Sequence, residues 1–244
     1  MTQIVEGVHR LGTALVNFYL VEDGGRYTLV DAGLPGYFDG LQEALEARGK
    51  GLDALDAVVL THAHNDHIGM AERVRTAAGV PVYVHGDDAD MARTGKLPRR
   101  EGSLLPYLVR PTAIKLIAHM AANGGARPPR IREVTTFADG EVLDVPGRPR
   151  IVATPGHTDG HCSVHFEQHG VLFTGDALCS RNPLTGRVGP QVMPPAFNTS
   201  TQRALASLDR IAGLAVSHLL FGHGEPWTDG ARSAVERARE LGPS

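Results

Sequence analysis

The segment 62–67, His-Ala-His-Asn-Asp-His, places three imidazoles and one carboxylate in six consecutive positions. Neutral imidazole and carboxylate are the ligands that borderline divalent metals such as zinc prefer. His62 and His64 alternate, so an extended backbone directs both side chains to the same side. Asp66 and His67 follow where the chain turns toward a helix, whose unpaired amides favour an anion. The spacing therefore predicts a metal-binding loop between a strand and a helix.

Three later segments offer the same ligand types, and each follows an apolar run that resembles a strand. These segments are Pro-Gly-His-Thr-Asp-Gly-His at 155–161, Gly-Asp-Ala at 175–177 and Gly-His-Gly at 222–224. Their glycines permit tight turns and close backbone approach around an ion. Each segment alone is a weak signal. The four segments together, in this order, predict one composite site.

This ordered set resembles the metallo-β-lactamase superfamily, in its glyoxalase II-like and lactonase-like branch. The matched motifs are His-x-His-x-Asp-His, Gly-His-Thr-x-Gly-His, Gly-Asp and Gly-His-Gly, and they span residues 62 to 223. Residues 27–33, Tyr-Thr-Leu-Val-Asp-Ala-Gly, are similar to the family's first motif, a strand that ends in an aspartate. The resemblance implies an α/β (α+β) fold, a four-layer αββα sandwich with the site at one edge between its two sheets.

Residue by residue, the resemblance implies seven metal ligands: His62, His64 and His157 for a first ion, Asp66, His67 and His223 for a second, and Asp176 as the bridge. It further implies that Asp31 orients a ligand histidine from behind, a role whose loss usually weakens metal affinity. An ordinary turn aspartate is the alternative for Asp31. His161 matches the second histidine of its motif, which is not a usual ligand in this family.

The implied reaction is hydrolysis of an ester, lactone or thioester by a hydroxide bound to two zinc ions. Hydroxide is available at neutral pH because a divalent metal lowers the pKa of bound water to about 7. Asp66 is assigned the role of orienting this nucleophile and of transferring a proton. Iron or manganese could replace zinc, because these ligands accept all three metals. Aspartate rather than cysteine at position 176 disfavours antibiotic hydrolysis.

Two other enzyme classes share parts of this pattern. A mononuclear iron dioxygenase acting on a persulfide is similar over residues 174–181, but Gly222-His223-Gly224 and His161 resemble the hydrolases more. A metal-dependent nuclease is disfavoured by the net charge of −3 and by the lack of a basic patch interleaved with aromatic residues. A non-catalytic binding protein would more often have lost a ligand, and no ligand is missing here.

Length and composition agree with a cytoplasmic enzyme. The chain has 244 residues, 42% of them hydrophobic, which is enough for a substantial core. The two cysteines, Cys162 and Cys179, predict reduced thiols, and Cys179 is expected to be a buried packing residue. No stretch is long enough to span a membrane, and the first residues lack the pattern of a signal peptide. We therefore expect a small-molecule substrate, and neither nucleic acid nor a membrane as partner. Oligomeric state cannot be read from the sequence.

The apolar periodicity predicts alternating strands and helices in two halves of one domain, residues 1–244. The predicted strands are 16–22, 26–31, 57–60, 82–85, 133–137, 141–145, 151–154, 163–167, 171–174 and 216–221. The predicted helices are 37–48, one that begins near residue 68 and ends at 78, 201–213 and 229–241.

Residues 95–130 interrupt this alternation and are predicted to form an insert of one or two short helices. Five prolines break the segment, and several leucines and isoleucines make it apolar. One interpretation is a plain connector packed on the core. The other is a lid beside the metals that gives the substrate an apolar wall, since pockets are mostly apolar with a few polar groups. In that case residues 192–197, Val-Met-Pro-Pro-Ala-Phe, are expected to line the same pocket, whereas packing is the expected role of Tyr107.

Overall fold

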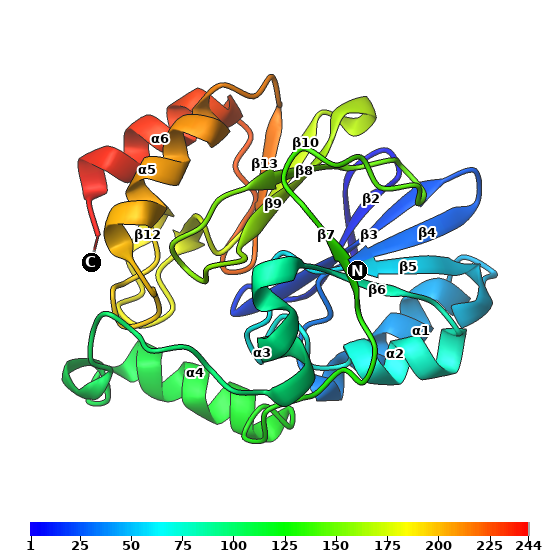
Figure 1. Ribbon diagram of the computed structural model, residues 1–244, viewed down its shortest axis with the longest axis horizontal. Helices are drawn as coiled ribbons and strands as arrows, with labels where there is room; N and C mark the ends of the chain where they lie inside the picture. Colours follow the sequence, from blue (N-terminus) through cyan, green and yellow to red (C-terminus); the bar gives the residue numbers. More distant parts are fainter. Residues whose placement is uncertain (244) are drawn as a thin grey trace.

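The computed structural model describes residues 1–243 and contains two β-sheets that pack face to face (Figure 1). The first sheet has seven strands in sequence order: β1 (Thr2–Val5), β2 (Val8–Thr13), β3 (Val16–Asp23), β4 (Arg26–Val30), β5 (Leu55–Val59), β6 (Val82–His85) and β7 (Thr135–Phe137). Strands β1 to β4 form an antiparallel meander. Strands β4 to β7 pair in parallel, so their carboxyl ends lie at one edge of the sheet.

The second sheet has the strand order β13-β10-β9-β8. Its strands are β8 (Arg150–Ala153), β9 (Cys162–Phe166), β10 (Val171–Gly175) and β13 (His218–Phe221). Strands β10 and β13 are parallel, and both therefore end at the same edge. A separate two-stranded sheet pairs β11 (Cys179–Arg181) with β12 (Val188–Gln191).

The alternation of side chains along the central strands divides the interior into layers. In β3, Phe18 and Leu20 pack on the helix side of the sheet, whereas Tyr19 and Val21 face the other sheet. Strand β10 does the same in the second sheet, where Phe173 faces the first sheet and Leu172 faces the helices. Both faces of each sheet are covered, which explains why these strands are apolar at nearly every position.

Helices cover the two outer faces (Figure 1). On the first sheet lie α1 (Phe38–Glu46), α2 (Ala71–Ala78) and α3 (Ala89–Thr94), and on the second α5 (Thr201–Ala212) and α6 (Gly230–Leu241). The layers are thus helix, sheet, sheet and helix, which confirms the predicted sandwich. Helix α4 (Pro111–Ala122) lies apart from both helical layers, with a small cluster of its own around Ala113 and Leu116.

Two element predictions are wrong, for local reasons. The predicted strand at residues 141–145 is reduced to one isolated bridge, Val142 with Arg150. Leu143 and Val145 are buried as the pattern requires, yet Pro149 has no N–H to continue the ladder. The helix predicted from residue 68 begins at Ala71, because Gly69 and Met70 donate their N–H groups to the backbone at residues 33 and 32 instead.

Other predicted elements are present, with ends that differ by no more than two residues. Cys162 and Cys179 are free thiols, and Cys179 is buried, as predicted. Cys162 is buried as well. None of the helices that residues 1–243 form combines the length and the apolar character that a membrane crossing requires.

Candidate metal centre

All the predicted ligands follow strands whose carboxyl ends meet at one edge of the sandwich. His62, His64, Asp66 and His67 follow β5, the middle of the parallel part of the first sheet. Asp176 and His223 follow the parallel strands β10 and β13 of the second sheet, one residue and two residues after the strand ends. His157 lies in the loop between β8 and β9. Parallel pairing in both sheets thus brings together side chains that are distant in the sequence.

The structure brings the seven predicted ligands into three overlapping groups. The donor atoms within each group lie within 4.8 Å of one another: His62, His64 and His157; Asp66, His67 and His223; His62, His67 and Asp176. The first group offers three imidazoles, and each of the other two offers two imidazoles and one carboxylate. Both donor sets suit zinc and similar divalent ions.

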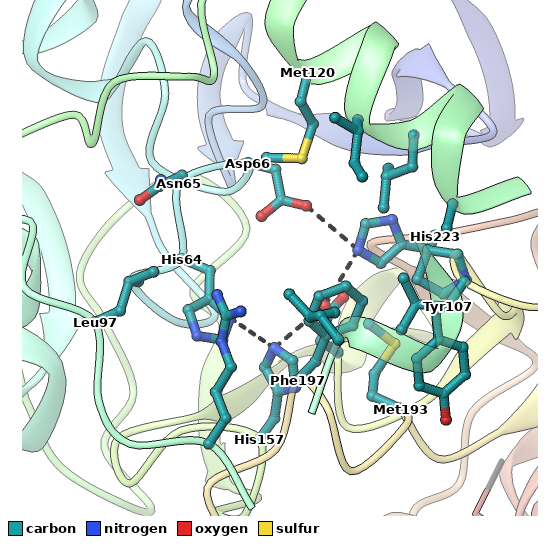
Figure 2. A pocket seen from close by; sticks show the side chains of 18 of the residues that line it. His64, Asn65, Asp66, Leu97, Tyr107, Met120, His157, Met193, Phe197 and His223 are labelled. Carbon is teal, nitrogen blue, oxygen red and sulfur yellow. Dashed lines mark hydrogen bonds and ion pairs between the residues drawn. The ribbon is translucent and has the colours of Figure 1, made fainter. Parts of the chain in front are cut away.

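Asp176 lies between the other two groups. Its Oδ2 atom is 3.4 Å from His157 Nε2 and 3.2 Å from His223 Nε2, and its Oδ1 atom is 3.4 Å from His67 Nε2. Figure 2 shows that His64, His157, Asp66 and His223 converge around one cavity. A carboxylate in this position can contact ions on both of its sides.

Three donor atoms of the centre are buried and have no hydrogen-bond partner among the described residues: His62 Nε2, His67 Nε2 and Asp176 Oδ1. An unsatisfied buried polar atom destabilises a protein by about 1–3 kcal/mol, and more when the group is charged. These three atoms belong to one of the groups above and point at the same space. The residues present therefore fit a bound cation, which would satisfy all three atoms at once.

Burial lowers the pKa of the histidines on one side of the centre. It lowers the pKa of His64 and of His157 to about 3, and the neighbouring imidazoles add to the effect of burial for His157. The pKa of His62 is also held well below its usual value by burial and by His67 and His157. These imidazoles stay neutral near pH 7, and the neutral form is the one that binds metals.

The carboxylates dominate on the other side. Burial opposes protonation of His67, but Asp176 and Asp31 outweigh it and raise the pKa of His67 well above its usual value. In the same way Asp176 outweighs burial and raises the pKa of His223 to about 8. Burial acts to raise the pKa of Asp176, yet His223 and His67 hold it well below its usual value. The centre is thus built around a carboxylate that stays ionised.

Asp31 supports the loop after β5 from behind. Its backbone has φ +58°, a left-handed conformation that is uncommon for a residue with a side chain. In this conformation the carboxylate accepts hydrogen bonds from the Thr61 N–H at 2.8 Å and the Thr61 hydroxyl, and lies 2.8 Å from His67 Nδ1. The contact fixes the orientation of the His67 ring and leaves Nε2 directed at Asp176.

Replacing Asp31 with asparagine is expected to lower the affinity for one metal ion by about 10–100-fold, the usual effect of losing the partner of a ligand histidine. Asparagine keeps the size of the side chain but removes the charge that holds the His67 ring. Titration of the metal-free protein with zinc against a competing chelator measures the effect. Asp144→Asn, at an exposed carboxylate, is the matched control and should change nothing. Equal affinities of Asp31→Asn and the unsubstituted protein would show that Asp31 is an ordinary turn residue.

Asp88, which the sequence analysis did not single out, ties two ligand loops together. It is buried, 2% exposed, just after β6. Its carboxylate accepts hydrogen bonds from the N–H of Ala63 at 3.0 Å, the hydroxyl of Thr158 at 2.7 Å and the N–H of Gly160 at 2.9 Å. The sequence held one signal for this role. Asp88 follows the parallel strand β6, just as Asp31 and His62 follow β4 and β5.

His161 and Asn198 also contact the centre without belonging to its three groups. His161 Nε2 accepts a hydrogen bond from the backbone N–H of Asp176 at 3.0 Å, which holds that residue in place. His161 therefore lies beside the centre but belongs to none of the three donor groups. The Oδ1 atom of Asn198 lies 3.1 Å from Nδ1 of His157 and fixes that ring. No sequence motif marked Asn198.

Gly222 is required by close packing beside the ligands. A Cβ atom at this position would lie 2.4 Å from Asp176 Oδ1 and 2.5 Å from His67 Cε1. Any larger residue would displace one of the two side chains. The glycine before His223 therefore serves the packing of the centre rather than a turn.

A pocket of about 820 Å³, including the part open to solvent, adjoins the centre. His64, Asp66, His157 and His223 form its polar end (Figure 2), and Asp176 lines the pocket as well. The opposite wall is apolar and comes largely from residues 95–130: Leu97, Leu104, Tyr107, Leu108, Ala113, Leu116, Ile117 and Met120. Met193 and Phe197 of the second predicted segment line it as well. Tyr107 packs against the α4 cluster and faces the pocket at the same time.

Comparisons with known proteins agree with the fold. A model of the metallo-beta-lactamase superfamily matches residues 11–223. The chain is similar to the protein named probable metallo-hydrolase YflN of Bacillus subtilis, with 31% identity over 93% of this chain and 87% of that protein. It is similar to a hydroxyacylglutathione hydrolase of Acidiphilium cryptum, with 33% identity over 78% of this chain and 59% of that protein. A metallo-beta-lactamase family protein of Thermus thermophilus superposes with a TM-score of 0.68 and 27% identity, over 98% of this chain and 79% of that one.

The chain belongs to the metallo-beta-lactamase superfamily. This confirms the resemblance drawn from the motifs. The family and the fold together support a metal-dependent hydrolase, which is the enzyme class that the sequence predicts.

Proposed function

We propose that this protein hydrolyses an ester, lactone or thioester whose acyl or alcohol part is apolar, and that it does so with two divalent ions, most simply zinc. The single observation that carries the proposal is the buried, unpaired donor set beside an apolar pocket. The hydroxyacylglutathione hydrolase similarity favours thioesters within this class, but this chain spans only 59% of that relative.

The ligand assignment follows the contacts. We assign His62, His64 and His157 to the first ion, because these three lie together and stay neutral. Asp66, His67 and His223 are assigned to the second ion, and Asp176, which touches both sides, to the bridge. Two bound ions would supply Lewis-acid chemistry, lowering the pKa of a bound water and stabilising negative charge on the substrate carbonyl oxygen.

Asp66 is the residue assigned to proton transfer. It is half-buried, it lines the pocket, and its Oδ2 atom lies 3.5 Å from His223 Nε2. Its carboxylate can accept the proton that an attacking water gives up and deliver it to the leaving alkoxide or thiolate. The apolar wall opposite excludes water from the rest of the substrate and positions its carbonyl toward the polar end.

The test is elemental analysis of freshly purified protein, followed by a panel of lactone, thioester, carboxylic ester and phosphodiester substrates. We expect zinc, and turnover that stops when a chelator removes the metal and returns when zinc is added. Full activity of the metal-stripped protein would refute the proposal. Iron together with oxygen uptake on a persulfide would replace it with the dioxygenase reaction, and hydrolysis of the phosphodiester alone would replace it with the nuclease reaction.

Replacing Leu104 with alanine should lower kcat/KM for long-chain acyl esters by roughly tenfold and leave that for the acetyl ester almost unaffected. The reason is that each substrate methylene held in an apolar pocket contributes about 1–3 kcal/mol to binding in the transition state. The measurement is kcat/KM along a series of p-nitrophenyl esters. Leu52→Ala is the matched control, since Leu52 is also half-buried but packs under the first sheet. A uniform loss over the whole series would contradict the assignment of this wall to the substrate.

A further inference from the structure

The outer face of the segment 95–130 is apolar and exposed to solvent. Five large apolar residues of this segment, the insert patch, are exposed: Leu105, Leu108, Val109, Ile114 and Ile117. Leu105 and Val109 have relative exposures of 74% and 82%, so neither contributes to the core. Figure 1 shows helix α4 along the outer margin of the molecule, below α3. Several large apolar side chains exposed on one short segment are typical of an interaction site.

Helix α4 has the composition of a buried helix rather than of a surface helix. Its sequence is Pro-Thr-Ala-Ile-Lys-Leu-Ile-Ala-His-Met-Ala-Ala, with Lys115 and His119 as the only ionisable side chains. Ala113 and Leu116 pack inward, and Ile114, Ile117 and the later alanines face out. A helix that is apolar all round normally has a partner on every side. The outer side of α4 has none among residues 1–243.

The charge of the same segment is strongly positive. It contains seven basic residues and one acidic residue, Glu101, a net charge of +6 in a protein whose overall charge is −3. The basic residues are Lys96, Arg99, Arg100, Arg110, Lys115, Arg127 and Arg130. None of them is ion-paired with a carboxylate of the described residues. Arg110 and Lys115 lie next in sequence to Val109 and Ile114, so charge and apolar surface are interleaved.

The insert patch also continues into the pocket. Leu108 and Ile117 are exposed and at the same time line the pocket, and the basic Arg100 lines it as well. An apolar chain that entered the pocket would therefore pass the patch first.

We propose that the insert patch docks on an anionic lipid surface. The apolar side chains of the patch would enter the boundary between headgroups and acyl chains, while the neighbouring Arg110 and Lys115 contact lipid phosphates. The pocket mouth then faces the bilayer, and an amphiphilic ester or thioester can reach the metal centre from it; only this last clause rests on the proposed function. The sequence-based expectation of no membrane partner considered spanning segments alone, and an interfacial helix needs no such length.

A second copy of the chain could also cover the insert patch, but the positive charge of residues 95–130 disfavours this. A two-fold contact through the insert patch would place the same surface of both copies together. Two segments would then meet, each with a net charge of +6 that already includes its one acidic residue, Glu101. A surface of phosphates offers the opposite charge over the whole patch.

The test is co-sedimentation of the full chain with vesicles of phosphatidylcholine alone and with vesicles of phosphatidylcholine and phosphatidylglycerol in equal parts. We expect binding to the anionic vesicles, weaker binding as salt is added, and little binding to the neutral vesicles. Val109→Asp should lower the partition coefficient at least roughly tenfold, because it replaces an inserted apolar side chain with a charge that anionic lipid repels. Arg110→Glu should also weaken binding, through charge alone.

Val188→Asp is the matched control, at a valine outside the insert that is also largely exposed, 67% against 82% for Val109. It should bind like the unsubstituted protein, and all three variants should melt at the same temperature, since each changes an exposed side chain. No binding to anionic vesicles at low salt would overturn the proposal, as would equal losses in Val188→Asp and Val109→Asp. Concentration-dependent dimerisation that Val109→Asp abolishes, without vesicle binding, would assign the patch to a second copy instead. Because vesicle binding is measured without substrate, its result is independent of the hydrolase test.

Discussion

Replacing Asp176 with alanine is expected to abolish turnover and to weaken binding at both metal positions together. Asp176 contacts His67, His157 and His223 at 3.2–3.4 Å, and so touches both proposed ligand groups. Removal of a shared ligand should cost more than the 10–100-fold in metal affinity that follows loss of an outer partner. The variant also loses the charge that offsets two imidazoles of raised pKa, His67 and His223.

Two readouts check this prediction: kcat/KM on the best substrate of the panel, and zinc content after dialysis against a weak chelator. Asp209→Ala is the control, at an exposed aspartate paired with Arg239. It should retain activity and metal. Loss of a single ion from Asp176→Ala, with the other bound as tightly as before, would contradict the bridging assignment.

Replacing Asp88 with asparagine is expected to weaken one metal position only, the one assigned to His62, His64 and His157. The three hydrogen bonds of Asp88 end on Ala63, which lies between His62 and His64, and on Thr158 and Gly160, which follow His157. Asparagine has one acceptor oxygen in place of two, so it can accept only part of these three hydrogen bonds. Asp88 acts through the backbone of these loops, so it is a positioning residue rather than a catalytic one.

The expected effect of Asp88→Asn is a 10–100-fold lower affinity for one of two zinc ions, together with a destabilisation of about 1–3 kcal/mol for each buried donor left unsatisfied. Zinc titration against a chromophoric chelator separates the two binding steps, and thermal unfolding of the metal-free protein measures the second effect. Asp31→Asn should weaken the other ion, since Asp31 contacts His67. If Asp88→Asn lowers stability and leaves both zinc affinities unchanged, Asp88 has a structural role alone.

The metal loop was predictable from the sequence because its signals are local. His62, His64, Asp66 and His67 lie within six positions and directly follow an apolar strand, so residue type and spacing are enough. The segments of the distant residues His157, Asp176 and His223 were found at the ends of apolar runs, and the family's ordered motifs then gave these residues their ligand roles. Parallel pairing of β10 with β13 then explains why Asp176 and His223 meet.

Asp88 shows what the sequence could not reveal. Its contacts reach residues 70 and 72 positions away, and they depend on how β6 ends relative to β5 and β8. Strand β2 was missed for a different reason. The polar side chains of His9 and Arg10 interrupt its apolar pattern, yet His9 is buried, with Arg48 2.8 Å from its ring. A buried polar pair formed across the fold has no periodic signal.

The segment 95–130 was recognised as unusual from its prolines and leucines, but its two faces could not be distinguished. Helix α4 is apolar on every side, so periodicity gives no direction. Only the fold shows that Leu116 faces the pocket and that Ile114 faces solvent. Both the substrate wall and the insert patch depend on that distinction.

Anomalous diffraction at the zinc edge, from crystals of the protein purified with zinc, tests the central claim most directly. We predict two peaks, one against His62, His64 and His157 and one against Asp66, His67 and His223, with the Asp176 carboxylate between them. A map without a peak at these side chains, in protein that hydrolyses its substrate at full rate, would contradict the account.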